Sequence, residues 1–563
     1  MKFKDYKYEH LAYEDIEKEY LEKLEKIKRD SDVDSFMEDF RDINRFRGHI
    51  HTMETICSVR HTIDTSDKYY DDEQTYWDET SPRIQTLENE FMRICVESPL
   101  RDKLPIPKTF MMIAENSLKS FDPKIIEELQ EENRLSSAYG KLKASAKIEF
   151  EGEIYNLSSI QVKMLDPDRE TRKKACLAFN GYYEEHEAEF DDIYDALVKV
   201  RDKMAKKLGY KNFVELGYLR MNRLDYDEKM VATYREQVVN DIVPMATKIN
   251  ERDAKRIGVD KLKCYDMDYE FKTGSPKPYA PIDDLVKDAL KMYKEMSKET
   301  GEFFEMMVDC ELFDLPTRPN KELGGYSTDF FDYKTPFIFS NGNGTSQDVN
   351  TLTHEAGHAL QSYMSQKVID IPDITFPTYE SCEIHSMSME FFTHPWMNLF
   401  FKEDTEKYYY SHIAEALKFL PYGCLVDHFQ HEIYNHPEMT KEERKATWRE
   451  LEKIYKPDSD YDGIEILEKG GWFYRQGHIF QSPFYYIDYT LAQVCALQFY
   501  VRTLKNDENA WRDYLHICEL GGTKTFTEIV KEAGLISPFE KGCLSDVAKY
   551  MEIELGKIDD TNL

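Results

Sequence analysis

Residues 351–364 read TLTHEAGHALQSYM, and the rest of the chain is interpreted from this stretch. His354 and His358 are four positions apart, so on a helix both imidazoles lie on one face and can reach the same ion. Glu355 is rotated by about 100° from His354, where its carboxylate can hold a water molecule as a general base. The stretch predicts a helix over about 348–365 that carries two of the three protein ligands of a zinc site.

The third ligand must come from elsewhere in the chain. A third histidine after the motif would require glycine at position 361 and histidine at position 364, but the chain has Gln361 and Met364. Residues 377–395 read PTYESCEIHSMSMEFFTHP and predict a second helix over about 378–394. This segment offers three glutamates that share roughly one helical face, Glu380, Glu383 and Glu390. Helix geometry alone does not decide which of the three is the third metal ligand.

His385 lies off the face that the three glutamates share, and we interpret it as an ordinary polar residue. At the start of the first helix, Asp348 or Asn350 can act as N-cap and place a polar or negative group at the positive helix end.

A strand-like stretch precedes the first helix. Residues 324–345 read GGYSTDFFDYKTPFIFSNGNGT, with an apolar core at 336–339 followed by a glycine-rich turn. A strand leading through such a turn into the helix would place an extended edge beside the metal, where a peptide can bind by adding a strand. The candidate substrate-binding residues are Phe337, Phe339, Gly342 and Gly344. A second β signal, a hairpin, surrounds Glu151-Gly152-Glu153.

Composition limits the class of protein. The 563 residues are rich in Glu, Lys, Leu and Tyr and sparse in Gly (24) and Pro (21), which favours a mainly helical fold. A formal charge of −33 argues against nucleic acid and anionic lipid as partners. We find no secretory signal and no apolar run long enough to cross a membrane. Ten scattered cysteines without a CxxC pair indicate free thiols and a cytoplasmic protein.

HEAGH at 354–358 followed by ESCEIHSMSME at 380–390 resembles the thimet oligopeptidase and oligoendopeptidase F family of zinc metallopeptidases, especially its bacterial Pz-peptidase-type oligoendopeptidases. In that family the third ligand is the glutamate that opens an E-x-x-S-x-x-x-E pattern, which Glu383 to Glu390 match here. The resemblance therefore implies one Zn²⁺ per chain held by His354, His358 and Glu383. It implies Glu390 as a supporting carboxylate for a ligand histidine, and we place Asp348 in a supporting role as well.

Residues 477–493, GHIFQSPFYYIDYTLAQ, resemble the family's C-terminal loop and helix, where tyrosines and a histidine line the substrate cleft. The resemblance implies that Tyr489, Tyr486 and His478 stabilise the oxyanion that develops on the scissile carbonyl. Tyr485 competes for this role if the register shifts by one residue.

The family implies a helical ellipsoid with a deep substrate channel and a small β-sheet beside the zinc-binding helices. Residues 1–140 would form one wall of the channel and residues 141–563 the catalytic region. The implied activity is zinc-dependent endopeptidase cleavage of short unstructured peptides by a monomer or weak homo-oligomer. A metallo-carboxypeptidase or dipeptidyl carboxypeptidase of related helical fold and a non-catalytic peptide-binding protein are the alternatives.

Overall fold

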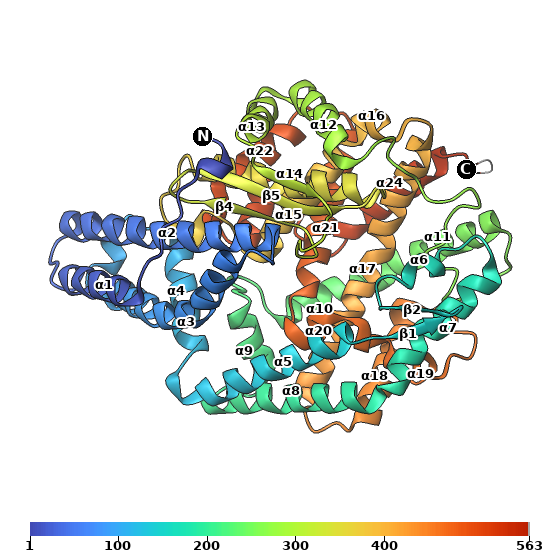
Figure 1. The fold of residues 1–563 in the computed structure, drawn as a ribbon, viewed down its shortest axis with the longest axis horizontal. Helices are drawn as coiled ribbons and strands as arrows, with labels where there is room; N and C mark the ends of the chain where they lie inside the picture. The colour runs from blue at the N-terminus through green and yellow to red at the C-terminus, as the bar shows by residue number, and fades with distance from the viewer. Residues whose placement is uncertain (561–562) are drawn as a thin grey trace. The chain divides into compact units, whose positions relative to one another are not determined.

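The chain is 69% helical (Figure 1). The structure is a computed structural model that describes residues 1–560 and 563. Two small sheets, of two and three strands, complete the described part of the chain, so the predicted mainly α class is confirmed. Within these residues, no helix is both long and apolar enough to span a membrane.

Two compact units divide the chain, and both are discontinuous in sequence. The first unit comprises residues 1–118, 276–405 and 495–536. The second comprises residues 119–275, 406–494 and 537–563. This partition differs from the predicted division at about residue 140, because segments distant in the sequence pack into the same unit.

The first unit contains the three-stranded sheet. Most helices and strands of this unit precede residue 405. Its elements are α1 (Tyr13–Ile27), α2 (Val33–Ile63), α3 (Lys68–Glu97), α4 (Lys108–Ser120), α12 (Ile282–Met296), α13 (Lys298–Asp309), β3 (Phe313–Pro316), β4 (Tyr326–Phe330), β5 (Thr335–Gly342), α14 (Gln347–Ser365), α15 (Tyr379–Phe392), α16 (Asn398–Phe401), α22 (Ala510–Leu520) and α23 (Phe526–Glu532).

The second unit contains the two-stranded sheet. Its elements are α5 (Ile126–Ala144), β1 (Ile148–Phe150), β2 (Glu153–Tyr155), α6 (Gln161–Met164), α7 (Arg169–Glu185), α8 (Glu187–Leu208), α9 (Phe213–Arg220), α10 (Glu228–Gln237), α11 (Val243–Ile257), α17 (Thr405–Asn435), α18 (Lys441–Tyr455), α19 (Glu465–Glu468), α20 (Gly477–Gln481) and α24 (Cys543–Lys557). Helix α21 (Tyr486–Leu504) contributes residues to both units.

The predicted hairpin is present as the antiparallel pair β1–β2. Glu151 and Gly152 form its two-residue turn with φ angles of 52° and 83°. Two consecutive positive φ values characterise the turn type that matches the twist of a two-stranded ribbon, and glycine adopts them without steric cost.

The predicted strand at 336–339 is β5, but its position in the sheet differs from the expectation. The strand order is β3-β5-β4, with β3 parallel and β4 antiparallel to β5. The expectation that this strand presents a free edge was wrong, because β3 and β4 pair with both of its edges. The edge strands of this sheet are β3 and β4.

Helix α14 follows β5 and packs against both β5 and β4. It spans 347–365, close to the predicted range, and its N-cap is Ser346. Asp348 does not cap the helix as predicted. Its carboxylate instead accepts the N–H groups of Asn343 and Gly344 at 3.0 and 2.8 Å. Asp348 therefore fixes the glycine-rich turn that connects strand and helix, and Gly344 adopts a φ of 88° there.

Candidate metal centre

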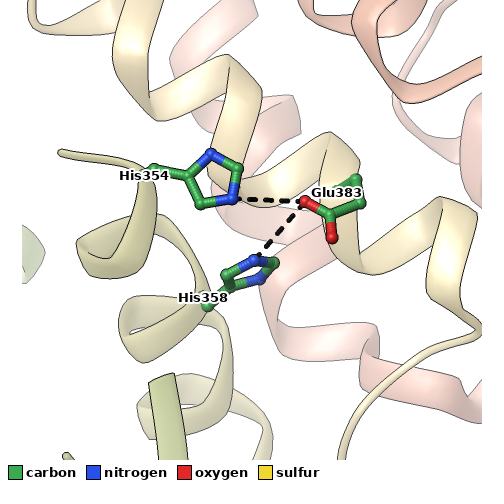
Figure 2. A group of neighbouring side chains, drawn as sticks. All are labelled: His354, His358 and Glu383. Carbon is green, nitrogen blue, oxygen red and sulfur yellow. Dashed lines mark ion pairs between the residues drawn. The ribbon is translucent and has the colours of Figure 1, made fainter. Parts of the chain in front are cut away.

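Two histidines and one carboxylate meet between α14 and α15 (Figure 2). His354 and His358 project from adjacent turns of α14, and their Nε2 atoms lie 3.3 and 3.5 Å from Oε2 of Glu383 on α15. The three ligand atoms lie within 4.8 Å of one another. Atoms about 2.0–2.1 Å from one tetrahedral zinc ion are separated by about 3.3 Å, so both measured distances suit a shared cation.

Further polar groups orient the three side chains. Glu390, two turns after Glu383 on α15, accepts a hydrogen bond from Nδ1 of His354 at 2.7 Å. This contact leaves Nε2 of His354 directed at Glu383. Ser386 donates its hydroxyl to Oε2 of Glu383 at 2.9 Å. Such contacts fix the orientation and tautomer of metal ligands. Sequence reasoning assigned no role to Ser386, although its i+3 spacing from Glu383 could have indicated one.

Gly357 allows α14 and α15 to approach each other closely. A Cβ atom at this position would lie 2.5 Å from the carbonyl oxygen of His385 and 2.7 Å from Cα of Ser386. Both neighbours are backbone atoms of α15, so a side chain at position 357 requires the helices to separate. Sequence reasoning also missed this role, because it depends on a crossing point between two helices.

The electrostatics of the cluster favour a charged carboxylate between two imidazoles. Burial acts to raise the pKa of Glu383, but His358 and His354 hold it far below the usual range. Burial acts to lower the pKa of His354, but hydrogen bonds with Glu383 and Glu390 raise it well above its ordinary value. Metal ligands bind in their deprotonated forms, so a carboxylate that stays charged between two imidazoles is suited to bind a divalent cation.

Glu355 is buried beside this cluster and is not one of the three converging ligands. Burial raises the pKa of Glu355, while the two histidines oppose that shift. Gly325, immediately before the edge strand β4, is close to it: a Cβ at Gly325 would lie 3.8 Å from Oε1 of Glu355 and 3.1 Å from Thr351. The carboxylate thus lies where the start of β4 meets α14.

The other polar residues of α15 have different environments. Glu380, one of the three tied glutamates, is buried and lies outside the converging group. His385 is fully buried, which corrects its interpretation as an ordinary polar residue, and burial lowers its pKa to about 4. Its carbonyl oxygen accepts a hydrogen bond from the Tyr514 hydroxyl at 2.8 Å. His385 is thus a neutral core residue at the helix crossing.

Two of the four candidate substrate-binding residues are internal. The rings of Phe337 and Phe339 are buried, and Phe337 packs 4.6 Å from Phe3 between ring centroids. A Cβ at Gly342 would lie 2.7 Å from Cγ2 of Ile282. Gly344 lies in the turn held by Asp348. Phe337 and Phe339 therefore contribute side chains to the core, and the expected side-chain contact with a substrate is not supported.

The aromatic residues predicted near the C-terminus gather in the second unit. The ring centroid of His478, on α20, lies 4.9 Å from that of Tyr486 and 6.0 Å from that of Tyr489, both on α21. Tyr485, the competing tyrosine, belongs to the same cluster, with its ring 5.7 Å from His478 and 4.9 Å from Tyr489. All four side chains are half-buried.

A strained residue immediately precedes these tyrosines. Phe484 adopts a φ of 68°, in the left-handed region that costs a bulky residue free energy. Its N–H donates to Gln430 at 2.9 Å, and its carbonyl oxygen accepts from Arg223 at 2.7 Å. Arg223 also forms a buried ion pair with Asp488, on the first turn of α21. These contacts fix the start of α21, which carries Tyr486 and Tyr489. No spacing rule in the sequence indicated them.

The fold and the cluster define a mainly helical protein with a candidate metal centre built on an HExxH helix and a glutamate from the next helix. The chain belongs to peptidase family M3, whose model matches residues 162–548. The model of the peptidase M3 N-terminal domain matches residues 3–121. The resemblance inferred from the motifs is thereby confirmed.

Known relatives agree with this assignment. The chain is 50% identical to Pz peptidase A, solved with an inhibitor, over 100% of both chains with a TM-score of 0.92. It is 26% identical over 379 residues to an oligoendopeptidase F homolog of Borreliella burgdorferi, covering 65% of this chain and 62% of the relative. It is 22% identical over 412 residues to oligopeptidase PepF of Bacillus subtilis, covering 69% of this chain and 58% of the relative. The match thus spans about three-fifths of the length of each of these two curated relatives.

Proposed function

We propose that this chain is a zinc-dependent oligopeptidase whose centre is formed by His354, His358 and Glu383. The observation that carries the proposal is the convergence of these three ligand atoms from α14 and α15, with the carboxylate of Glu355 beside them. Membership of peptidase family M3 supports a peptidase reaction at this centre.

The donor set suits zinc. Two imidazole nitrogens and one carboxylate oxygen form a ligand set of catalytic zinc sites, which keep a fourth position open. The hydrogen bond from His354 to Glu390 satisfies the imidazole nitrogen that would not face the ion, and the hydroxyl of Ser386 orients the Glu383 carboxylate through the same Oε2 atom that faces the histidines. Cobalt or manganese can occupy such a site as well, so metal analysis belongs in any test of the proposal.

When bound, the zinc ion supplies Lewis-acid polarisation and lowers the pKa of a water molecule. Glu355 accepts a proton from the attacking water at its carboxylate oxygen and delivers it to the nitrogen of the leaving amine. Tyr489, Tyr486 and His478 donate hydrogen bonds to the oxygen that becomes negative as the carbonyl is attacked. This assignment of the aromatic residues rests on their resemblance to the family's C-terminal motif.

Strand β4 is the edge on which we propose that the peptide binds. Among the residues that the structure describes, β4 pairs with β5 on one side and is an edge strand on the other, and the residue before it, Gly325, adjoins Glu355. An extended peptide that adds a strand to β4 would hydrogen-bond through its backbone and so be recognised largely independently of its sequence. This proposal replaces the expected pairing with β5, whose two edges are occupied.

The proposed substrates are short unstructured peptides, cleaved internally. Peptides with a blocked C-terminal carboxylate distinguish this activity from that of a metallo-carboxypeptidase, because an endopeptidase does not require the free carboxylate. We also propose a cytoplasmic location, from the scattered free cysteines.

Two variants test the catalytic assignment. Glu355→Gln keeps the size of the side chain but removes the base, so we expect bound zinc and a loss of hydrolysis of about 10²-fold or more. Glu383→Ala removes a ligand, so we expect loss of zinc. Glu380→Gln changes another glutamate of α15 and is the matched control, with zinc content and cleavage of a quenched fluorescent peptide as readouts. Near-normal hydrolysis by Glu355→Gln would refute the base assignment, and full zinc retention by Glu383→Ala would refute the ligand assignment.

A further inference from the structure

His478 is linked through its ring to a directional chain of hydrogen bonds. The Nε2 amide nitrogen of Gln476 lies 2.8 Å from Nδ1 of His478. The Oε1 atom of the same amide accepts a hydrogen bond from the Tyr422 hydroxyl at 2.8 Å. Tyr422 belongs to α17, and Gln476 is the residue immediately before α20. These hydrogen bonds therefore join two parts of the second unit.

The direction of these hydrogen bonds follows from the donors available. Burial raises the pKa of Tyr422 to about 12, and the indole N–H of Trp472 beside its hydroxyl opposes this shift. The Tyr422 hydroxyl donates its hydrogen to Oε1 of Gln476, because an amide oxygen can only accept. The amide oxygen of Gln476 therefore faces Tyr422, and its NH₂ group faces His478.

An amide NH₂ group facing Nδ1 determines the tautomer of the imidazole. In neutral histidine one ring nitrogen carries hydrogen and the other accepts, so an Nδ1 that accepts requires hydrogen on Nε2. The ring is neutral at neutral pH, because burial lowers the pKa of His478 and the positive charge of Lys143 on α5 lowers it further. The phenols of Tyr485, Tyr486 and Tyr489 also pack around the ring.

We propose that Gln476, oriented by Tyr422, is a positioning residue that holds His478 as the neutral Nε2–H tautomer, so that the ring donates a hydrogen bond to the carbonyl oxygen of the peptide. The proposal rests on the proposed function of His478 and deepens it. Neutral imidazole is an effective hydrogen-bond donor to a developing oxyanion, because it needs no protonation step and brings no competing charge. Neither Gln476 nor Tyr422 was indicated by the sequence motifs.

The tautomer can be measured directly, without metal or substrate. Protein labelled with ¹³C and ¹⁵N in histidine gives ring resonances that distinguish Nε2–H, Nδ1–H and doubly protonated imidazole. The chain has 15 histidines, so the signals of His478 are assigned by their absence in His478→Gln. We expect the neutral Nε2–H form between about pH 7 and 9. An Nδ1–H ring, or an even mixture of tautomers, would overturn the proposal.

Two substitutions at Gln476 separate positioning from packing. Gln476→Leu removes the donor, and we expect kcat to fall about tenfold with little change in KM, less than the about 10²–10³-fold cost of losing an oxyanion-hole donor itself. Gln476→Glu keeps the shape but offers an acceptor to Nδ1, which favours the wrong tautomer and protonation of the ring. We therefore expect Gln476→Glu to lose more activity than Gln476→Leu and to shift the acid limb of the kcat profile to higher pH.

The outcomes are distinct. If Gln476 only packs, Gln476→Glu restores activity relative to Gln476→Leu, and that result would refute the positioning role. Gln481→Leu, an exposed glutamine on α20, is the matched control and is expected to keep both the tautomer and kcat of the original protein. A protein with the expected His478 tautomer but no peptidase activity would contradict the proposed function and leave the tautomer assignment standing.

Discussion

Gly357→Ala tests whether the metal centre depends on the close crossing of α14 and α15. The added Cβ would meet the carbonyl oxygen of His385 at 2.5 Å, whereas ordinary contact begins at 3.4 Å, so the helices must separate there by about 0.9 Å. Gly357 lies between His354 and His358 in the sequence. The backbone that it faces is that of His385 and Ser386, two and three residues after Glu383. The separation therefore occurs within the site.

The magnitude follows from two opposing effects. Alanine is more favourable than glycine in a helix by about 1 kcal/mol. Overpacking a close contact costs about 1–3 kcal/mol, so we expect the free energy of unfolding to fall by about 0–2 kcal/mol. Functional groups must be held to within about 0.5 Å, and a displacement of about 0.9 Å exceeds this tolerance. We expect zinc affinity to fall about 10–100-fold, as when supporting contacts of a metal ligand are lost.

The assay is competition for zinc against a chromophoric chelator, together with thermal unfolding of the zinc-free protein. The matched control is Gly181→Ala on α7, where an added Cβ meets no atom within 4 Å. This control should gain up to about 1 kcal/mol of stability from helix propensity and keep its zinc affinity. If Gly357→Ala matched the control in both measurements, the close helix crossing would not be what holds the ligands in place.

Three further outcomes concern the same centre. Glu390→Gln removes the charge that holds Nδ1 of His354, and zinc titration should show an affinity about 10–100-fold lower. An unchanged affinity would mean that Glu390 does not orient the ligand. Ser386→Ala removes a hydrogen bond to the buried Glu383 carboxylate that is worth about 1.5–3 kcal/mol, so affinity should fall about tenfold or more in the same titration. Restoring zinc at 100 times its Kd should stabilise the chelator-treated protein by about 2.7 kcal/mol, and an unshifted thermal midpoint would argue against a zinc site.

Local patterns in the sequence predicted the elements that form the site. The apolar run at 336–339 became β5, and the HExxH segment became α14 over nearly the predicted range. These predictions succeeded because side-chain periodicity and turn residues act over a few residues of the chain. The position of β5 within its sheet was not predictable in this way: β4 precedes it across the short loop 331–334, but β3 pairs with its other edge in parallel through a longer connection.

Local patterns were also insufficient to decide which of three glutamates binds the metal. Glu380, Glu383 and Glu390 share one helical face, so spacing left them tied and a family pattern was needed to choose. In the structure Glu383 faces both histidines, Glu390 faces the outer nitrogen of His354, and Glu380 lies outside the cluster. The distinction depends on where α15 crosses α14, which Gly357 allows.

The sequence by itself determined the helical class, the HExxH helix and the types of residue available as ligands, because these depend on composition and on contacts a few residues apart. Only the tertiary structure decided which glutamate meets the histidines, that Asp348 fixes a turn instead of a helix end, and that Phe337 and Phe339 belong to the core. It also revealed the support of His478 by Gln476 and Tyr422. Each of these depends on side chains brought together from separate elements, and a distance between elements is not encoded in any local pattern of residues.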